Sequence, residues 1–272
     1  MDARFLAYRV NGSSLCVRVE DHALVSPLRF LFPSYEMPGS GALAGAPTVT
    51  VRRTGTVWTV TDGSGAYPCA TSIEVAEAVE YALTQAFLGL VSDAVHLHAA
   101  GVLLGEGATL LVGAEGAGKT SLAFWLSRRG HPVLGDDVAL VRAGGRVDAF
   151  KRLFKVDPAV LAEAGVTVEQ TRLWEPGAST AWYDPSDGAG WADKAKIASV
   201  VLLERGAGRD ERLAPLRRSE AVTLLMRHLL STGLHGSAAF EVLADAVHGA
   251  DVATLSFSSA ARGASLLGGT RG

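Results

Sequence analysis

The chain has 272 residues, which is enough for one large domain or two small ones with a sizeable buried core. Hydrophobic residues make up 48% of it and charged residues 19%, which is ordinary for a globular protein. The net charge of −3 offers no electrostatic attraction to nucleic acid or to an anionic membrane, so we expect neither as a partner.

The cysteines and the first residues favour a cytoplasmic location. Cys16 and Cys69 lack the spacing of metal ligands and are too few for a disulfide framework, so we expect buried free thiols. Residues 1–4 lack the basic-then-apolar build of a signal peptide. No apolar run approaches the roughly 20 residues that a membrane-spanning helix needs. We therefore expect a protein of the reducing cytoplasm.

Residues 1–70 are predicted to form a small β-rich accessory domain. Strand-like runs occur at 15–19, 48–52 and 56–60, with a turn cluster at 62–65. Residues 71–95 are predicted to be a linking helix, because Thr71-Ser72-Ile73-Glu74 has the pattern of a capping box. Apolar residues then recur at helical spacing, namely Val79, Leu83, Phe87 and Leu90.

Residues 96–272 are predicted to form a nucleotide-binding domain organised around a glycine-rich loop. This loop reads Gly113-Ala114-Glu115-Gly116-Ala117-Gly118-Lys119-Thr120 and fits the phosphate-binding pattern G-x-x-x-x-G-K-[ST] at every required position. The apolar runs 102–104 and 108–112 predict a hairpin of strands before it, and 122–126 predict a helix after it. We assign nucleotide contact to the loop and to Ser121, which follows it.

The residue types of the loop suit this chemistry. Glycines let the backbone curl so that successive N–H groups point at phosphate oxygens, and the helix that opens near Lys119 adds its positive end there. Lys119 can then reach the β- and γ-phosphates of a nucleoside triphosphate, and the Thr120 hydroxyl can ligate magnesium.

The rest of the chain continues an α/β pattern. A strand is predicted to end at Gly135, a hairpin to span 138–150, and a short helix to run from Asp157 to Ala164. Residues 175–195 are predicted to be a long loop, because they are rich in glycine, proline, aspartate and serine. Further elements are predicted at 197–203 (strand), from Ser219 (helix), and at 240–247 (helix), 252–257 (strand) and 260–267 (helix).

Two further features favour phosphoryl transfer over mere binding. Asp136 and Asp137 follow a predicted strand after the loop's own helix, where a carboxylate can hold the metal or accept the proton of an attacking hydroxyl. His98 lies just before the hairpin that delivers the loop, although a core histidine beside His96 remains an alternative. Arg152, Lys155 and Lys194 are basic, but we assign none of them to the site.

The order of His98, the glycine-rich loop and the run Arg129-Gly130-His131-Pro132-Val133-Leu134-Gly135-Asp136-Asp137 resembles HPr kinase/phosphorylase. The resemblance covers residues 96–142. It implies an α/β fold with a P-loop domain of the HPr kinase or PEP carboxykinase-like type, ATP and Mg²⁺ as cofactors, and a serine hydroxyl as acceptor. It further implies that Lys119 steadies the transferred group, Thr120 and Asp136 hold the metal, and Asp137 is the general base with His98 beside it.

The chain departs from that family at Thr120-Ser121, where a serine and a glutamate are usual, and in lacking the family's later glutamate-isoleucine-arginine-glycine-leucine-glycine run. It is more similar to divergent HPr-kinase-related proteins, some of which phosphorylate a serine on precursors of ribosomally made peptides such as lasso peptides. The acceptor implied is therefore a peptide or small protein. Related kinases are commonly oligomers, so a homo-oligomer is one expectation.

Two alternatives use the same residues. One is a kinase for a small hydroxylated metabolite, which would differ only in what fills the cleft. The other is a non-catalytic regulatory protein that binds nucleotide and orders the 175–195 segment. A regulatory switch has no need of paired carboxylates after the loop, so the residues favour catalysis.

Overall fold

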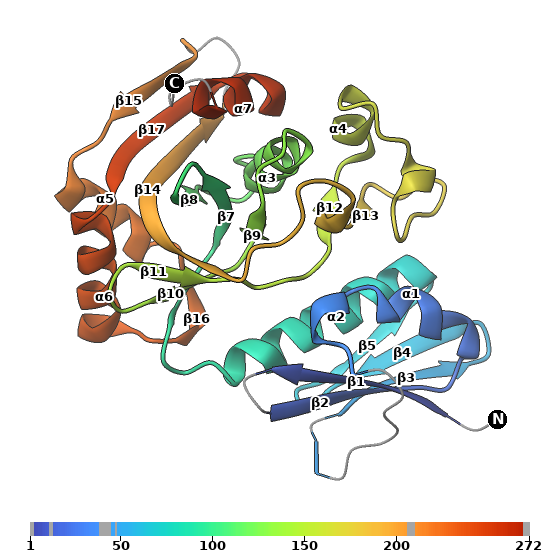
Figure 1. The fold of residues 1–272 in the computed structure, drawn as a ribbon. Helices are drawn as coiled ribbons and strands as arrows, with labels where there is room; N and C mark the ends of the chain where they lie inside the picture. Colours follow the sequence, from blue (N-terminus) through green and yellow to red (C-terminus); the bar gives the residue numbers. More distant parts are fainter. Residues whose placement is uncertain (1–2, 11–12, 38–44, 47, 206–209, 269–272) are drawn as a thin grey trace. The chain divides into compact units, whose positions relative to one another are not determined.

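The computed structural model describes residues 3–10, 13–37, 45–46, 48–205 and 210–268. Within them the chain is a mixed α/β protein with several sheets, and it divides into two units (Figure 1). Unit 1 comprises Met1–Ser92, Lys151–Leu153 and Arg172–Ala178. Unit 2 comprises Asp93–Phe150, Phe154–Thr171 and Ser179–Gly272.

Unit 1 is built on a sheet whose described strands lie in chain order from β1 to β5. They are β1 (Arg4–Val10), β2 (Ser13–Val19), β3 (Thr48–Thr54), β4 (Val57–Thr61) and β5 (Ala66–Cys69). Neighbours are antiparallel except β2 and β3, which run parallel. The strands predicted at 15–19, 48–52 and 56–60 are confirmed as β2, β3 and β4, whereas β1 and β5 are additions. Both cysteines are buried and free, as predicted.

The helix predicted to link the two halves of the chain is α2 (Ser72–Gly89), and it packs on the sheet of unit 1. Its capping is as predicted: the Thr71 Oγ1 atom accepts a hydrogen bond from the Glu74 backbone N–H at 3.1 Å. The predicted apolar face is present at Val79, Leu83 and Phe87, which are fully buried, whereas Leu90 is the C-cap residue and only partly buried. The short helices η1 (His22–Leu24), α1 (Val25–Arg29) and η2 (Pro33–Tyr35) precede β3.

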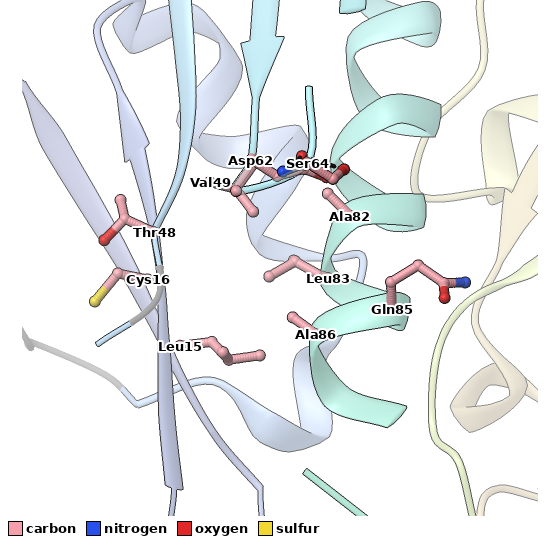
Figure 2. A pocket seen from close by; sticks show the side chains of 11 residues that line it. Leu15, Cys16, Thr48, Val49, Asp62, Ser64, Ala82, Leu83, Gln85 and Ala86 are labelled. Carbon is pink, nitrogen blue, oxygen red and sulfur yellow. Dashed lines mark hydrogen bonds between the residues drawn. The ribbon is translucent and has the colours of Figure 1, made fainter. Parts of the chain in front are cut away.

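A cavity of about 320 Å³ lies between this sheet and α2 (Figure 2). The helix contributes the small side chains of Ala82 and Ala86, and the sheet contributes Leu15 and Val49. Most of its wall is apolar. Alanines at these helix positions leave space that larger side chains would fill.

Two later segments belong to unit 1 as well. The Leu153 backbone N–H donates to the Leu31 carbonyl at 3.2 Å, and Arg152 forms a buried ion pair with Glu80. Ser72 donates a hydrogen bond to Glu175. The predicted domains are continuous stretches of chain with boundaries at 70 and 95. They do not include the return of residues 151–153 and 172–178 to unit 1. Whether the units correspond to domains with those boundaries stays a prediction.

Unit 2 is built on a larger sheet with the order β16-β6-β10-β11-β14-β8-β7-β9; in addition, β17 pairs with β14, and β15 pairs with β17. Its strands are β6 (Val95–Leu97), β7 (Ala99–Leu104), β8 (Gly107–Val112), β9 (Val133–Gly135), β10 (Ala139–Arg142), β11 (Arg146–Asp148), β14 (Lys194–Arg205), β15 (Arg212–Pro215), β16 (Leu229–Gly233) and β17 (Asp251–Phe257). The predicted hairpins are confirmed as β7–β8 and β10–β11.

The parallel strands β8, β14 and β17 end at the same edge of this sheet, since Leu202 pairs with Val112 and Arg205 pairs with Phe257. Such an edge is where α/β sheets usually bind ligands. The helices of the unit are α3 (Lys119–Arg128), α4 (Pro158–Glu163), α5 (Arg218–Met226), α6 (Gly236–His248) and α7 (Ala260–Gly268), with the turns η3 (Val168–Gln170) and η4 (Pro185–Asp187).

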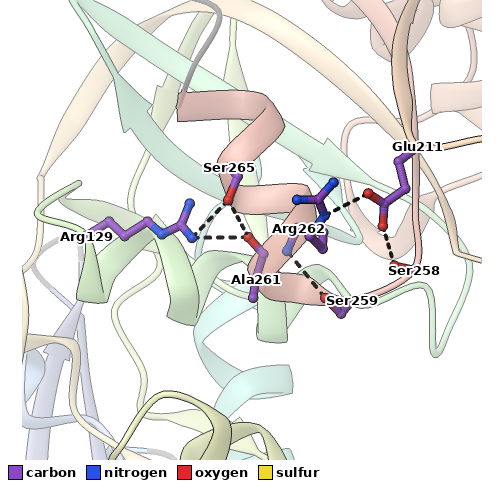
Figure 3. A network of polar contacts seen from close by, with 7 residues as sticks. All are labelled: Arg129, Glu211, Ser258, Ser259, Ala261, Arg262 and Ser265. Carbon is purple, nitrogen blue, oxygen red and sulfur yellow. Dashed lines mark hydrogen bonds and ion pairs between the residues drawn. The ribbon is translucent and has the colours of Figure 1, made fainter.

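Helix α7 is fixed at that edge by polar contacts (Figure 3). Glu211 accepts hydrogen bonds from Ser258 and from the Arg262 Nε atom, the latter at 2.8 Å. Arg129, at the end of α3, donates to the Ala261 carbonyl and the Ser265 hydroxyl, each at 3.1 Å. These contacts hold α3 and α7 beside each other, just beyond the end of β17.

The prediction of an unbroken loop at 175–195 is wrong. Strand β13 (Ala181–Tyr183) lies within it and pairs with β12 (Phe154–Val156), and β14 already begins at Lys194. Trp182 and Tyr183 are buried, so packing of these aromatic rings outweighs the turn-forming residues around them. No helix among the described residues is long and apolar enough to span a membrane.

Candidate active site

The glycine-rich loop lies between β8 and α3, which confirms the predicted strand before it and helix after it. Gly113 packs closely on β14, because a Cβ atom there would meet the Leu203 Cβ atom at 3.2 Å and the Ala117 Cβ atom at 2.9 Å. Gly116 and Gly118 have φ angles of 74° and 94°, which favour glycine. The tight curl that phosphate binding requires is therefore built into the backbone.

Lys119 begins α3 and turns its side chain back into the loop. Its Nζ atom donates to the carbonyl oxygens of Gly113 at 2.9 Å and Ala114 at 3.1 Å. Burial lowers the pKa of Lys119, while the charges of Asp137, Asp136 and Glu115 oppose that shift. The amine is thus buried and held in place, with its hydrogen bonds directed at backbone oxygens.

Thr120 and Asp136 lie side by side as possible metal ligands. The Thr120 hydroxyl donates to the Asp136 Oδ2 atom at 3.1 Å, and Asp136 is buried. Both are oxygen donors of the kind that Mg²⁺ prefers. No group of three or more histidine, cysteine or acidic residues that could hold a metal ion occurs in the described part of the chain. These two side chains fit a Mg²⁺ ion that takes its other ligands from phosphate and water.

His98 and Asp137 form the second pair of the site. The His98 Nε2 atom lies 2.6 Å from the Asp137 Oδ1 atom, and the two side chains are 29% and 39% exposed. The His98 backbone N–H donates to the His228 carbonyl at 2.8 Å. This hydrogen bond holds the stretch of main chain that carries the imidazole. His96, by contrast, is buried beside Thr232, so the two histidines do not share an environment.

A pocket of about 250 Å³ brings most of the predicted residues together. Its wall consists of His98, Glu115, Gly116, Gly118, Lys119, Thr120, Ser121, Asp137 and Arg205. The remaining predicted residues lie outside the wall. Gly113 is buried against β14, and Asp136 is buried and accepts the hydrogen bond from Thr120. Ala114 and Ala117 are part of the loop backbone.

Two residues near the pocket were missed by the sequence analysis. Arg205 ends β14, and its place follows from the parallel pairing of β14 with β8, which no local pattern reveals. His228 follows α5, and its pKa is lowered by burial and by the nearby charges of Lys119 and His98. Of the basic residues left unassigned, Arg152 pairs with Glu80 within unit 1, and Lys194 begins β14 at the opposite end from Arg205.

No protein-family model and no curated protein sequence matches the chain. Among solved structures, the HPr(Ser) kinase/phosphatase from Coxiella burnetii is similar with a TM-score of 0.32 and 12% sequence identity. The match covers 60% of this chain and 85% of that one.

Proposed function

We propose that this protein is an ATP- and Mg²⁺-dependent kinase that transfers the γ-phosphoryl group to the hydroxyl of a serine in a peptide or small protein. One observation carries the proposal: the His98–Asp137 pair, 2.6 Å apart, lines the same pocket as the glycine-rich loop. A protein that only holds nucleotide needs the loop. It does not need a partly exposed carboxylate, oriented by a histidine, beside it.

In the proposed reaction Asp137 is the general base. The acceptor oxygen attacks the γ-phosphorus, its proton passes to the Asp137 carboxylate, and the bond to the β–γ bridging oxygen breaks so that ADP leaves. His98 holds the Oδ1 atom of that carboxylate and so sets its direction. The backbone hydrogen bond from His98 to His228 supports this geometry.

The loop side of the pocket is assigned to the triphosphate. Lys119 would exchange its hydrogen bonds with the Gly113 and Ala114 carbonyls for phosphate oxygens. Thr120 and Asp136 would hold Mg²⁺, which supplies positive charge where negative charge develops on the phosphates. The backbone amides around Gly116 and Gly118 would complete the anion site.

A large acceptor is favoured over a small metabolite by the openness of the acceptor side. Both side chains of the His98–Asp137 pair are partly exposed, so a hydroxyl on a larger molecule can approach them from solvent. The resemblance drawn from the sequence implies the same class of acceptor.

The test is transfer of label from [γ-³²P]ATP in the presence of Mg²⁺. Two acceptor panels are offered: serine-containing peptides, each matched with its serine-to-alanine version, and small alcohols. We expect an acid-stable, alkali-labile phosphoester on serine peptides alone, with transfer abolished by EDTA. Label confined to small alcohols would replace the peptide kinase by a metabolite kinase. ATP binding without any transfer would contradict catalysis and leave the regulatory alternative.

A further inference from the structure

Arg205 occupies a defined position on the rim of the glycine-rich loop. It is the last residue of β14, which lies parallel to the strand that delivers the loop. A Cβ atom built on Gly118 would meet the Arg205 Cδ atom at 3.8 Å, so the stem of the arginine lies along the loop's backbone. Phe257, its partner on β17, packs against the same glycine. Strand β14 therefore brings Arg205 to the pocket wall, with β17 packed beside it.

Arg205 differs from Lys119, the other basic residue of the pocket wall, in its exposure and in its contacts. Lys119 is buried and directed at the carbonyls of Gly113 and Ala114. Arg205, in contrast, is exposed, and within the described residues no ion pair or hydrogen bond engages its side chain. Glu115 and Asp137 on the same wall are acidic. A polyphosphate entering the pocket would meet Arg205 as a cation at the surface.

We propose that Arg205 is a phosphate-binding residue of this site and contacts the polyphosphate chain from the rim of the pocket. Arginine suits this role because its planar guanidinium can pair two N–H groups with two phosphate oxygens at once. The inference deepens the proposed function and rests on it only in requiring that the pocket holds a nucleoside triphosphate.

The experiment measures dissociation constants by calorimetry for ATP with Mg²⁺ and for inorganic tripolyphosphate. The proteins are the wild-type chain, Arg205→Ala, Arg205→Lys and the control Lys196→Ala. Lys196 is an exposed cation on the same strand but near its other end. Because Arg205 is exposed, we expect all variants to keep the wild-type thermal midpoint.

We expect Arg205→Ala to bind both ligands about ten- to a hundredfold more weakly, the usual cost of losing hydrogen bonds to a charged group. Arg205→Lys should lie between Ala and wild type, and Lys196→Ala should match wild type. Unchanged affinity of Arg205→Ala, or an equal loss in Lys196→Ala, would overturn the inference and leave the kinase proposal standing. A wild-type chain that binds neither ligand would overturn both. Because binding is measured without transfer, failure of catalysis alone does not affect the inference.

Discussion

Gly118 and Gly130 flank helix α3 with almost the same backbone conformation, at φ angles of 94° and 91°. Alanine at either position should lower the free energy of unfolding by about 1–2 kcal/mol, because a side chain disfavours the left-handed region. Gly118 lies in the pocket wall, whereas a Cβ atom at Gly130 would meet nothing within 4 Å. The two substitutions therefore separate a general backbone cost from an effect on the loop.

We expect Gly118→Ala to weaken ATP binding by about tenfold or more, because a change in φ turns the loop's amides away from the phosphates. Gly130→Ala should bind ATP as the wild type does. Denaturant unfolding and ATP titration of both variants make the comparison. Equal ATP affinity in the two variants would show that the Gly118 conformation does not matter for binding.

His228 should make stability depend on pH. Its pKa is lowered from 6.5 by burial, and by the charges of Lys119 and His98. Between the lowered pKa and about 6.5, the folded chain binds fewer protons at this residue than the unfolded chain does. The contribution of His228 to the free energy of unfolding is therefore fully present above about pH 6.5 and is lost as the pH falls towards the lowered pKa.

Replacing His228 by Gln should flatten the decline in unfolding free energy as the pH falls below about 6.5. The control is His248→Gln, an exposed histidine in the last turn of α6. Urea unfolding at a series of pH values measures both slopes. If His228→Gln kept the slope of the wild type, the lowered pKa would have no consequence for stability.

At the scale of elements, the N-cap of α2 is a local signal that the sequence alone could predict. Thr71→Ala removes the hydrogen bond to the Glu74 N–H and should lower the free energy of unfolding by about 1 kcal/mol. The control is Thr223→Ala in α5, whose hydroxyl bonds back to the Ser219 carbonyl on an exposed face and contributes little. Chemical denaturation compares the two, and equal losses would argue against a capping role.

Most elements around the loop were predictable because their signals are local. The hairpin β7–β8 follows from two apolar runs around Gly105, and α3 follows from apolar spacing after the loop. Strand β13 was missed because its burial depends on pairing with β12, about 27 residues earlier, and not on its own neighbours. The residues of a strand do not reveal which distant strand it will pair with.

At the scale of the whole molecule, the same contrast holds for the site. His98, Lys119 and Asp137 were predictable as neighbours because one motif order places them within a short stretch of chain. Arg205 reaches the same pocket only through the sheet, since β14 inserts between β8 and β17. The assignment of 151–153 and 172–178 to unit 1 is likewise non-local.

The most direct test of the central claim compares Asp137→Asn with Asp251→Asn. Asp251 is an exposed aspartate at the start of β17, at the far end of that strand from Phe257. We predict that Asp137→Asn keeps the wild-type ATP affinity but transfers phosphate about a hundredfold more slowly or worse, because it loses the general base. Asp251→Asn should match the wild type in both. Wild-type transfer by Asp137→Asn would contradict the account.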